Sequence, residues 1–167
     1  MTDALVIDTC VLEHLFNPVW NGDEHIDRLL KKIAQRSKKI CMDRPVGTRK
    51  SRMLQEYEHR LQGWWAKPDG KNRLQWLRYV VYQGGRLPVE VNLADGLGCC
   101  VVPHLNRVRA ERSDHVFVYA ACASNSSMIS NNARHITNLS QDLCKCARTH
   151  GSRNTEFICS AEAESRI

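Results

Sequence analysis

Long hydrophobic runs are absent from this sequence. No stretch of its 167 residues approaches the roughly 20 consecutive apolar residues that a membrane-spanning helix needs. The first residues, MTDALVID, also lack the basic and apolar regions of a secretory signal peptide. We therefore expect a cytoplasmic protein.

Repeats, low-complexity segments and linker-like stretches are absent too. The hydrophobic content of 43% and the charged content of 25% are ordinary for a soluble globular chain. A chain of this length can bury a sizeable core. We expect a single domain that spans residues 1–167.

The cysteine spacing of a structural zinc site is missing. There are eight cysteines but no Cys-x-x-Cys pair, and Cys99-Cys100 and Cys144-x-Cys146 are only approximate matches to metal-binding spacing. In the absence of a signal peptide, we expect reduced thiols that pack as small apolar side chains.

Acidic residues are fewer than basic residues in this sequence. Lys and Arg number 24 against 18 Asp and Glu, so the net charge is +6 and the isoelectric point is about 9.0. An excess of positive charge favours a polyanionic partner such as nucleic acid, although many basic proteins bind none.

The apolar residues alternate between strand-like and helix-like patterns along the chain. Residues 84–104 contain several Gly, two Pro and a few β-branched residues and fit neither pattern, whereas Ser113 resembles a helix N-cap. An alternation of strands and helices favours parallel pairing in an α/β sandwich. The pattern predicts strands at 4–8, 39–42, 127–130 and 155–159, and helices at 9–16, 24–37, 48–62, 71–82, 114–124 and 136–148.

The stretch ALVIDTCVLEHLF, residues 4–16, ends a buried strand on the charged residue Asp8. A buried carboxylate is costly unless a donor or a cation meets it. Asp8 therefore either caps the following helix or holds a metal. In parallel sheets, ligands gather beyond the carboxyl ends of the strands, where Asp8, Asn131 and Asn132 are all predicted to lie.

Four segments, in chain order, are VIDTCVL (6–12), MLQEYEHRL (53–61), DHVFVYAACASNSSMISNNARHI (114–136) and TEFICSAEAES (155–165). Together they resemble the PIN-domain family of metal-dependent nucleases, and in particular the toxins of bacterial toxin–antitoxin pairs. The resemblance implies a three-layer α/β/α sandwich with a central, mostly parallel sheet. It also implies an endoribonuclease that hydrolyses the phosphodiester bonds of single-stranded RNA, with an antitoxin protein and a homodimer as possible partners.

The same resemblance implies an acidic site. Asp8, Glu56 and Asp114 match the family's metal-binding acids, which would hold Mg²⁺ or Mn²⁺. Both ions are hard cations that prefer oxygen ligands, and clustered carboxylates raise one another's pKa when no cation is present. Alternatives remain for each acid. Asp8 and Asp114 could serve only as helix caps, and Glu56 could be a solvated helix residue.

The fourth acidic position of the family aligns with Asn132 in this chain, with Asn131 as the alternative one residue earlier. An asparagine offers a neutral carbonyl oxygen, so it would assist catalysis while weakening a second metal site. An alternative follows from this departure, namely a catalytically degenerate module that binds RNA or protein without cutting.

Several further residues are candidates for contacts with substrate. Thr9 and Ser130 could position a water or a phosphate, and arginines near the acids in sequence could contact phosphates. For His135, a packing or surface role is the favoured interpretation. The arginine candidates are Arg49, Arg52 and Arg112.

Overall fold

The chain folds around a five-stranded sheet with the strand order β3-β2-β1-β4-β5. Every pair of neighbouring strands is parallel. The computed structural model describes residues 3–16, 24–36, 38–46, 48, 50–65, 89–92, 101–107, 110 and 112–167. The strands are β1 (Ala4–Ile7), β2 (Lys39–Asp43), β3 (Val89–Val91), β4 (Ser127–Ile129) and β5 (Phe157–Ile158).

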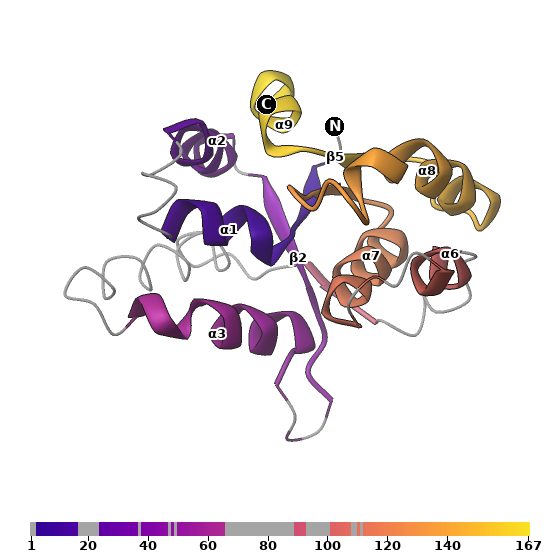
Figure 1. Ribbon diagram of the computed structural model, residues 1–167, viewed down its shortest axis with the longest axis horizontal. Coiled ribbons are helices and arrows are strands. Elements are labelled where there is room, and N and C mark those ends of the chain that lie inside the picture. Colours follow the sequence, from indigo (N-terminus) through magenta and orange to yellow (C-terminus); the bar gives the residue numbers. More distant parts are fainter. Residues whose placement is uncertain are drawn as a thin grey trace.

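Helices cover both faces of this sheet. In Figure 1, α1, α2 and α3 lie on one side of the strands, and α6, α7 and α8 lie on the other. The predicted α/β/α sandwich with a parallel central sheet is therefore confirmed. The helices are α1 (Thr9–Phe16), α2 (Glu24–Gln35), α3 (Arg52–Trp65), α6 (Val101–Arg107), α7 (Arg112–Ser124), α8 (Ser140–Thr149) and α9 (Ser160–Arg166), with a 3₁₀ turn at Thr137–Leu139.

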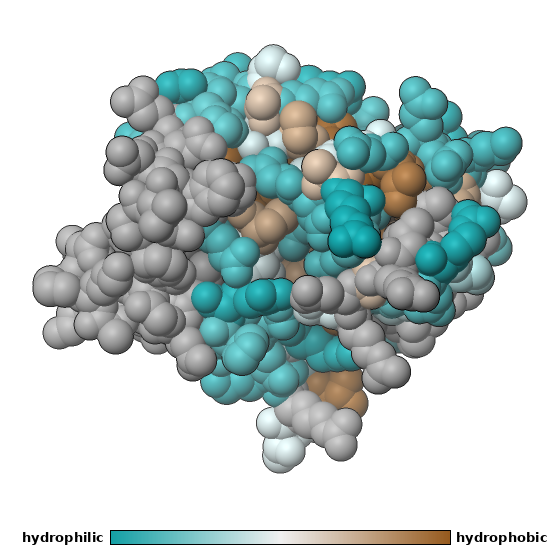
Figure 2. All heavy atoms as spheres, viewed as in Figure 1, coloured by the Kyte–Doolittle hydropathy of each residue, from teal (hydrophilic) through white to brown (hydrophobic). Residues whose placement is uncertain are grey.

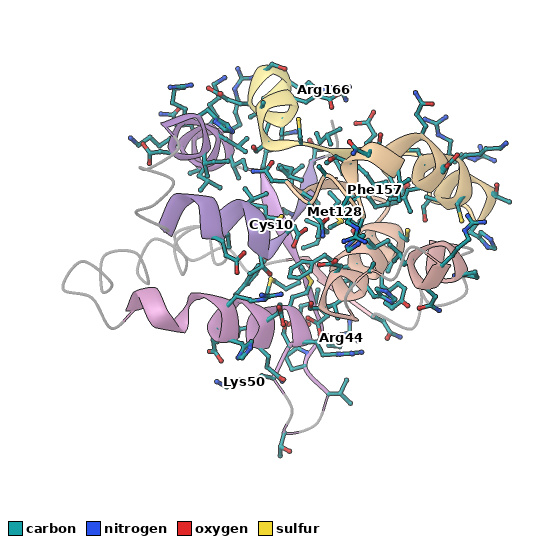
Figure 3. All side chains as sticks on the ribbon, viewed as in Figure 1. Cys10, Arg44, Lys50, Met128, Phe157 and Arg166 are labelled. Atoms are coloured by element: carbon teal, nitrogen blue, oxygen red, sulfur yellow. The ribbon has the colours of Figure 1, made fainter. Side chains whose placement is uncertain are left out.

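The central strand β1 is apolar without alternation because both of its faces are covered. Leu5, Val6 and Ile7 are each at most 1% exposed. Met128 of β4 and Phe157 of β5 also point into the core, whereas Arg44 and Lys50 point outward (Figure 3). Burying a large apolar side chain contributes about 1.5–3 kcal/mol to stability relative to leaving it exposed. The fully buried residues of β1 and β4 place the centre of the core at these two strands.

Helices α2 and α9 pack against each other beside this core. The apolar stripe expected for residues 24–37 is fully buried on α2. The other face of α2 is tied to the C-terminal helix, since Arg28 Nε lies 2.8 Å from Glu164 Oε1 and His25 Nε2 lies 2.8 Å from Ser160 Oγ. The strand predicted at 155–159 is β5, and α9 follows it, beginning within the resembling segment 155–165. The stripe on α2 is Ile26, Leu29, Leu30 and Ile33.

Most element boundaries differ from the sequence prediction by a few residues. Helix α3 begins at Arg52 instead of residue 48, and α7 begins at Arg112, so Ser113 lies in its first turn and is not the N-cap. Residues 84–104, left unassigned, contain the three-residue strand β3 and the start of α6. The helix predicted at 71–82 falls outside the described residues.

Hydrophilic side chains cover most of the described surface on the face seen in Figure 2. Of the large hydrophobic residues in the described part of the chain, only Val46 is strongly exposed. No helix among the described residues is both long and apolar enough to cross a membrane.

The cysteines follow the expectation only in part. Cys10, Cys41, Cys122, Cys144 and Cys159 are free thiols, as expected. Cys146 is disulfide-bonded, so the expectation of reduced thiols is wrong for this residue.

Candidate active site

The connections out of the sheet diverge between β1 and β4. From β1 the chain builds outward through β2 to β3, whereas β4 and β5 lie on the other side of β1. Such a switch point leaves a crevice at the carboxyl ends of the two strands, and ligands of α/β proteins commonly bind there. Asp8 directly follows β1 and Ser130 directly follows β4. The backbone N–H of Asp8 donates to the carbonyl of Ile129 at 2.9 Å, which holds the two strand ends together.

Asp8 forms the base of this crevice and is only 3% exposed. Its Oδ2 accepts a hydrogen bond of 2.6 Å from Ser130 Oγ and another of 3.2 Å from Cys10 Sγ. Burial raises the pKa of Asp8 to about 6, a rise opposed by the bond from Ser130 and increased by the negative charge of Asp114. Asp8 also accepts the backbone N–H of Cys10, so it caps α1 while facing a second acid.

Helix α3 presents Glu56 because its start is anchored at the end of β2. The backbone N–H groups of Arg52 and Met53 donate to the Asp43 carboxylate at 2.7 and 2.8 Å, and the Ser51 hydroxyl also donates to it. These bonds satisfy N–H groups that the first turn of a helix leaves without partners. They explain why α3 begins four residues later than the sequence pattern predicted.

Tyr57 sets the rotation of α3. Its hydroxyl donates to the carbonyl of Ile7, and its ring packs on Phe117 of α7 with centroids 5.5 Å apart. With Tyr57 buried, Glu56 beside it faces the crevice. Glu58, two residues further along the helix, points elsewhere and pairs with Lys50 at 3.1 Å.

Glu56 has a cationic neighbour one turn along the same helix. Arg60 Nε lies 3.1 Å from Glu56 Oε1, and both side chains line one pocket. Sequence reasoning did not single out Arg60. Its position four residues after Glu56 was the available signal, because residues at that spacing share a helix face.

Asp114 enters from the first turn of α7. Its Oδ2 accepts a hydrogen bond of 3.0 Å from Asn132 Nδ2 and lies 3.5 Å from His135 Nδ1. The helix dipole favours an anion in a first turn, but these two contacts also direct Asp114 toward the loop after β4. His135 is therefore part of the site, whereas the sequence favoured a packing or surface role.

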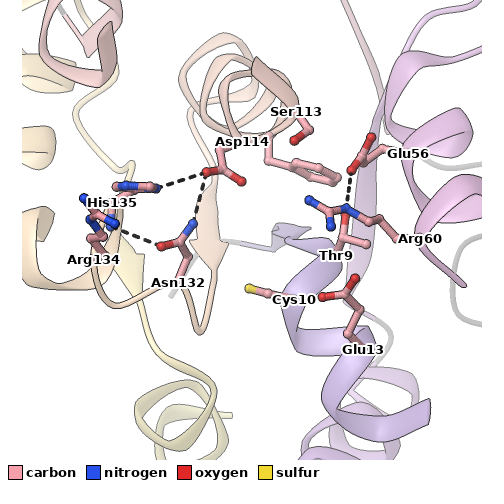
Figure 4. A pocket seen from close by; sticks show the side chains of 11 residues that line it. Thr9, Cys10, Glu13, Glu56, Arg60, Ser113, Asp114, Asn132, Arg134 and His135 are labelled. Carbon is pink, nitrogen blue, oxygen red and sulfur yellow. Dashed lines mark hydrogen bonds and ion pairs between the residues drawn. The ribbon is translucent and has the colours of Figure 1, made fainter. Parts of the chain in front are cut away.

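These side chains surround a pocket of about 260 Å³. Figure 4 shows Glu56 and Asp114 entering it from opposite sides, with Thr9 and Cys10 below them. Asp8 and Ser130 do not line the pocket but lie beneath it, bonded to each other. The lining residues are Thr9, Cys10, Glu13, Glu56, Arg60, Ser113, Asp114, Phe117, Asn132, Arg134 and His135.

The residues predicted to contact substrate lie in different places relative to the pocket. Thr9 lines the pocket and Ser130 is bonded to Asp8. Arg52 is exposed at the start of α3 and does not line this pocket. Arg112 begins α7, but its side chain, like the whole of Arg49, lies outside the description, so the roles of both stay predictions. The structure adds Glu13, Arg60 and Arg134, which the sequence had not singled out.

The donor chemistry of the pocket is suited to a hard divalent cation. Asp8 and Asp114 are close enough for the charge of one to raise the pKa of the other, a repulsion that a cation between them would relieve. Thr9 Oγ1 is buried and has no hydrogen-bond partner in the described part of the chain. Buried polar atoms normally have one, so this hydroxyl has room for a ligand or a bound water.

Other observations limit this fit. Each of the three acids has its own protein donor: Ser130 and Cys10 for Asp8, Arg60 for Glu56, and Asn132 for Asp114. Within the described ranges, no three Asp, Glu, His or Cys side chains converge as a ready metal-binding group. The residues therefore fit Mg²⁺ or Mn²⁺ in chemistry and charge at Asp8 and Asp114, and Glu56 adds a carboxylate of which one oxygen is paired with Arg60.

Comparison with known proteins gives limited further information. No protein-family model matches the chain, and no curated protein matches it significantly in sequence. Among solved structures, it is similar to a chain in the crystal structure of VapBC2 from Rickettsia felis bound to a DNA fragment from their promoter. The TM-score is 0.45 and the identity 13%, over 78% of this chain and 89% of that chain. A similarity of this size carries no conclusion about activity.

Proposed function

We propose that this protein is a metal-dependent nuclease that hydrolyses phosphodiester bonds of single-stranded RNA, with the pocket between α1, α3 and α7 as its active site. One observation carries the proposal: Glu56 and Asp114 line a pocket at the switch point of a parallel sheet together with basic side chains, and the buried Asp8 lies beneath that pocket. Carboxylates serve to hold a cation, and arginine or histidine serves to hold a phosphate.

The roles follow from where each side chain lies. Asp8 and Asp114 would hold the cation, with Glu56 as a further carboxylate beside them, and Arg60 would be available to contact a phosphate of the substrate. When bound, a divalent cation activates water and shields the charge that develops on a phosphate undergoing hydrolysis. The buried hydroxyl of Thr9 orients a water or a phosphate oxygen. Arg134, exposed at the pocket, supplies a further phosphate contact.

The choice of single-stranded RNA, and membership of a toxin–antitoxin pair, rest on the sequence resemblance to PIN domains. An antitoxin that covers the pocket and a homodimer remain predictions of the same kind. Growth arrest on expression of the chain, relieved by a protein encoded beside it, would support the toxin assignment. Normal growth at high expression of active protein would count against it.

A second candidate is a module that binds RNA or protein without cutting. Two observations favour it. All three acids already accept hydrogen bonds from protein donors, and the residue at position 132 is neutral. The two candidates differ in one outcome, since a binding module retains RNA with or without metal and leaves it intact.

A matched pair of variants on α3 tests the nuclease. Glu56→Gln and Glu58→Gln make the same change two residues apart, but only Glu56 lines the pocket. We expect cleavage of a fluorogenic single-stranded RNA in Mn²⁺, no cleavage in EDTA, a strong loss in Glu56→Gln and near wild-type rates in Glu58→Gln. Equal rates for the two variants, or cleavage that persists in EDTA, would refute the proposal.

A further inference from the structure

Both ends of the Asn132 side-chain amide are engaged. Its Nδ2 donates to Asp114 Oδ2 at 3.0 Å, and its Oδ1 accepts the backbone N–H of His135 at 3.1 Å. The backbone of Asn132 is also held, because its N–H donates to Ser130 Oγ at 3.1 Å while Ser130 donates to Asp8. Asn132 is thus bonded to Asp114 through its side chain and linked to Asp8 through its backbone and Ser130.

These bonds determine which end of the amide faces the acids. A carboxylate only accepts hydrogen bonds and a backbone N–H only donates them. If the amide were rotated by half a turn, its oxygen would face the Asp114 carboxylate and its NH₂ group would face the His135 N–H. Both hydrogen bonds would then be lost. The side-chain oxygen of Asn132, Oδ1, therefore accepts a hydrogen bond from the turn, while the NH₂ end faces Asp114.

The orientation also changes the charge balance at Asp114. The Oδ2 that accepts from Asn132 is also the oxygen 3.5 Å from His135 Nδ1. Two nitrogen atoms, one from each of these residues, therefore lie beside the same oxygen of Asp114. An aspartate at position 132 could not donate and would add a charge at the same point.

We propose that Asn132 is a positioning residue that takes the place of a second cation, so that the pocket binds one divalent ion and not two. This inference rests on the proposed function, because it presumes that the pocket binds metal. It assigns Asn132 to orienting and partly neutralising Asp114, with no role as a metal ligand.

The test counts bound ions without measuring catalysis. Purified full-length protein is titrated with Mn²⁺ alone, and free Mn²⁺ is measured by electron paramagnetic resonance. Asp114→Asn gives the background from weak surface sites. We expect one specific Mn²⁺ per chain in the wild type. In Asn132→Asp we expect a second ion, or binding of the first that is tighter by at least about tenfold, the usual scale for changes beside a metal ligand.

Asn131→Asp is the matched control because it adds the same charge one residue away. Its Oδ1 accepts from the backbone N–H of Ser160 at the start of α9, so it faces away from Asp114. We expect this variant to bind one ion with wild-type affinity. Circular dichroism on each variant establishes that it is folded, and the wild-type count is informative even if Asn132→Asp does not fold.

The outcomes separate the two proposals. Two specific ions in the wild type, an unchanged count and affinity in folded Asn132→Asp, or an equal gain in Asn131→Asp would each overturn the role given to Asn132. Those results leave the metal-dependent nuclease standing. Absence of any specific ion in the wild type at millimolar Mn²⁺ would overturn the nuclease proposal itself.

Discussion

Two buried aspartates at neighbouring strand ends show how one residue type can serve structure or chemistry. Asp43 ends β2 and Asp8 follows β1, the two strands are parallel neighbours, and each aspartate is 3% exposed. The donors to Asp43 all come from the start of α3. Asp8 is instead bonded across the sheet to Ser130 and faces Asp114.

The two aspartates are equally buried, so their hydrogen-bond partners are what distinguishes them. A carboxylate surrounded by the N–H groups of a helix start is satisfied by its own fold. A carboxylate with a raised pKa that faces another acid is incompletely satisfied. The contrast predicts that changes at Asp43 impair folding and that changes at Asp8 impair function.

The largest expected effect is at Asp8. Asp8→Asn removes the buried charge while keeping nearly the same shape, so metal-dependent RNA cleavage should fall by at least about 10³-fold, which corresponds to about 4 kcal/mol on the barrier. Initial rates on single-stranded RNA measure this effect. The matched control is Asp142→Asn, an exposed acid on α8, which should cut normally. Activity retained in Asp8→Asn would show that Asp8 is only a cap.

The pH dependence of stability comes next. The folded pKa of Asp8, about 6, lies above its ordinary value of 3.8. Its contribution to stability is therefore complete below pH 3.8 and is lost as pH rises through 6. Relative to Asp8→Asn, the metal-free wild type should lose on the order of 2–3 kcal/mol between about pH 4 and pH 7.

Urea unfolding of both proteins in EDTA measures this difference. A gap between the two proteins that stays constant with pH would mean that Asp8 titrates normally. The wild type and the variant would then differ for some reason other than an unfavourable buried charge.

At Asp43 the effect should be on folding. Asp43→Asn keeps one acceptor oxygen but turns an NH₂ group toward the donors at the start of α3, which should cost about 2 kcal/mol of unfolding free energy. Urea unfolding measures the loss, and the cleavage rate per folded molecule should be retained. If Asp43→Asn had normal stability and no activity, the claim that Asp43 serves folding and Asp8 serves function would be wrong.

The smallest effect concerns Tyr57, which links α3 to the end of β1. Tyr57→Phe removes the hydroxyl that donates to Ile7 while keeping the ring contact with Phe117. We expect a loss of about 1 kcal/mol of stability. The affinity for Mn²⁺ should change little, because no metal-binding acid is altered. An affinity loss larger than that of Glu56→Gln would show that the rotation of α3 matters more than Glu56 itself.

The sequence predicted the periodic parts of the fold well and the tertiary contacts poorly. The apolar run of β1 and the stripe of α2 were readable because local periodicity reports burial. The start of α3 was not, because its cap comes from Asp43 on another element. Strand β3 was missed because three residues between unassigned segments carry too little pattern.

For the candidate site, strand ends and ordered motifs pointed to three acids and one asparagine. They led to Asp8, Glu56, Asp114 and Asn132, of which the last three line the pocket and Asp8 lies beneath it. Glu13 and Arg60 stand four residues after Thr9 and Glu56, so helical spacing could have found them. The orientation of the Asn132 amide could not be predicted, because it depends on bonds to α7 and to its own turn.

A crystal of the protein grown or soaked in millimolar Mn²⁺ tests the central claim most directly. The account predicts one anomalous peak in contact with the carboxylates of Asp8 and Asp114. A pocket without a peak at that concentration, or a peak held by other residues, would contradict it.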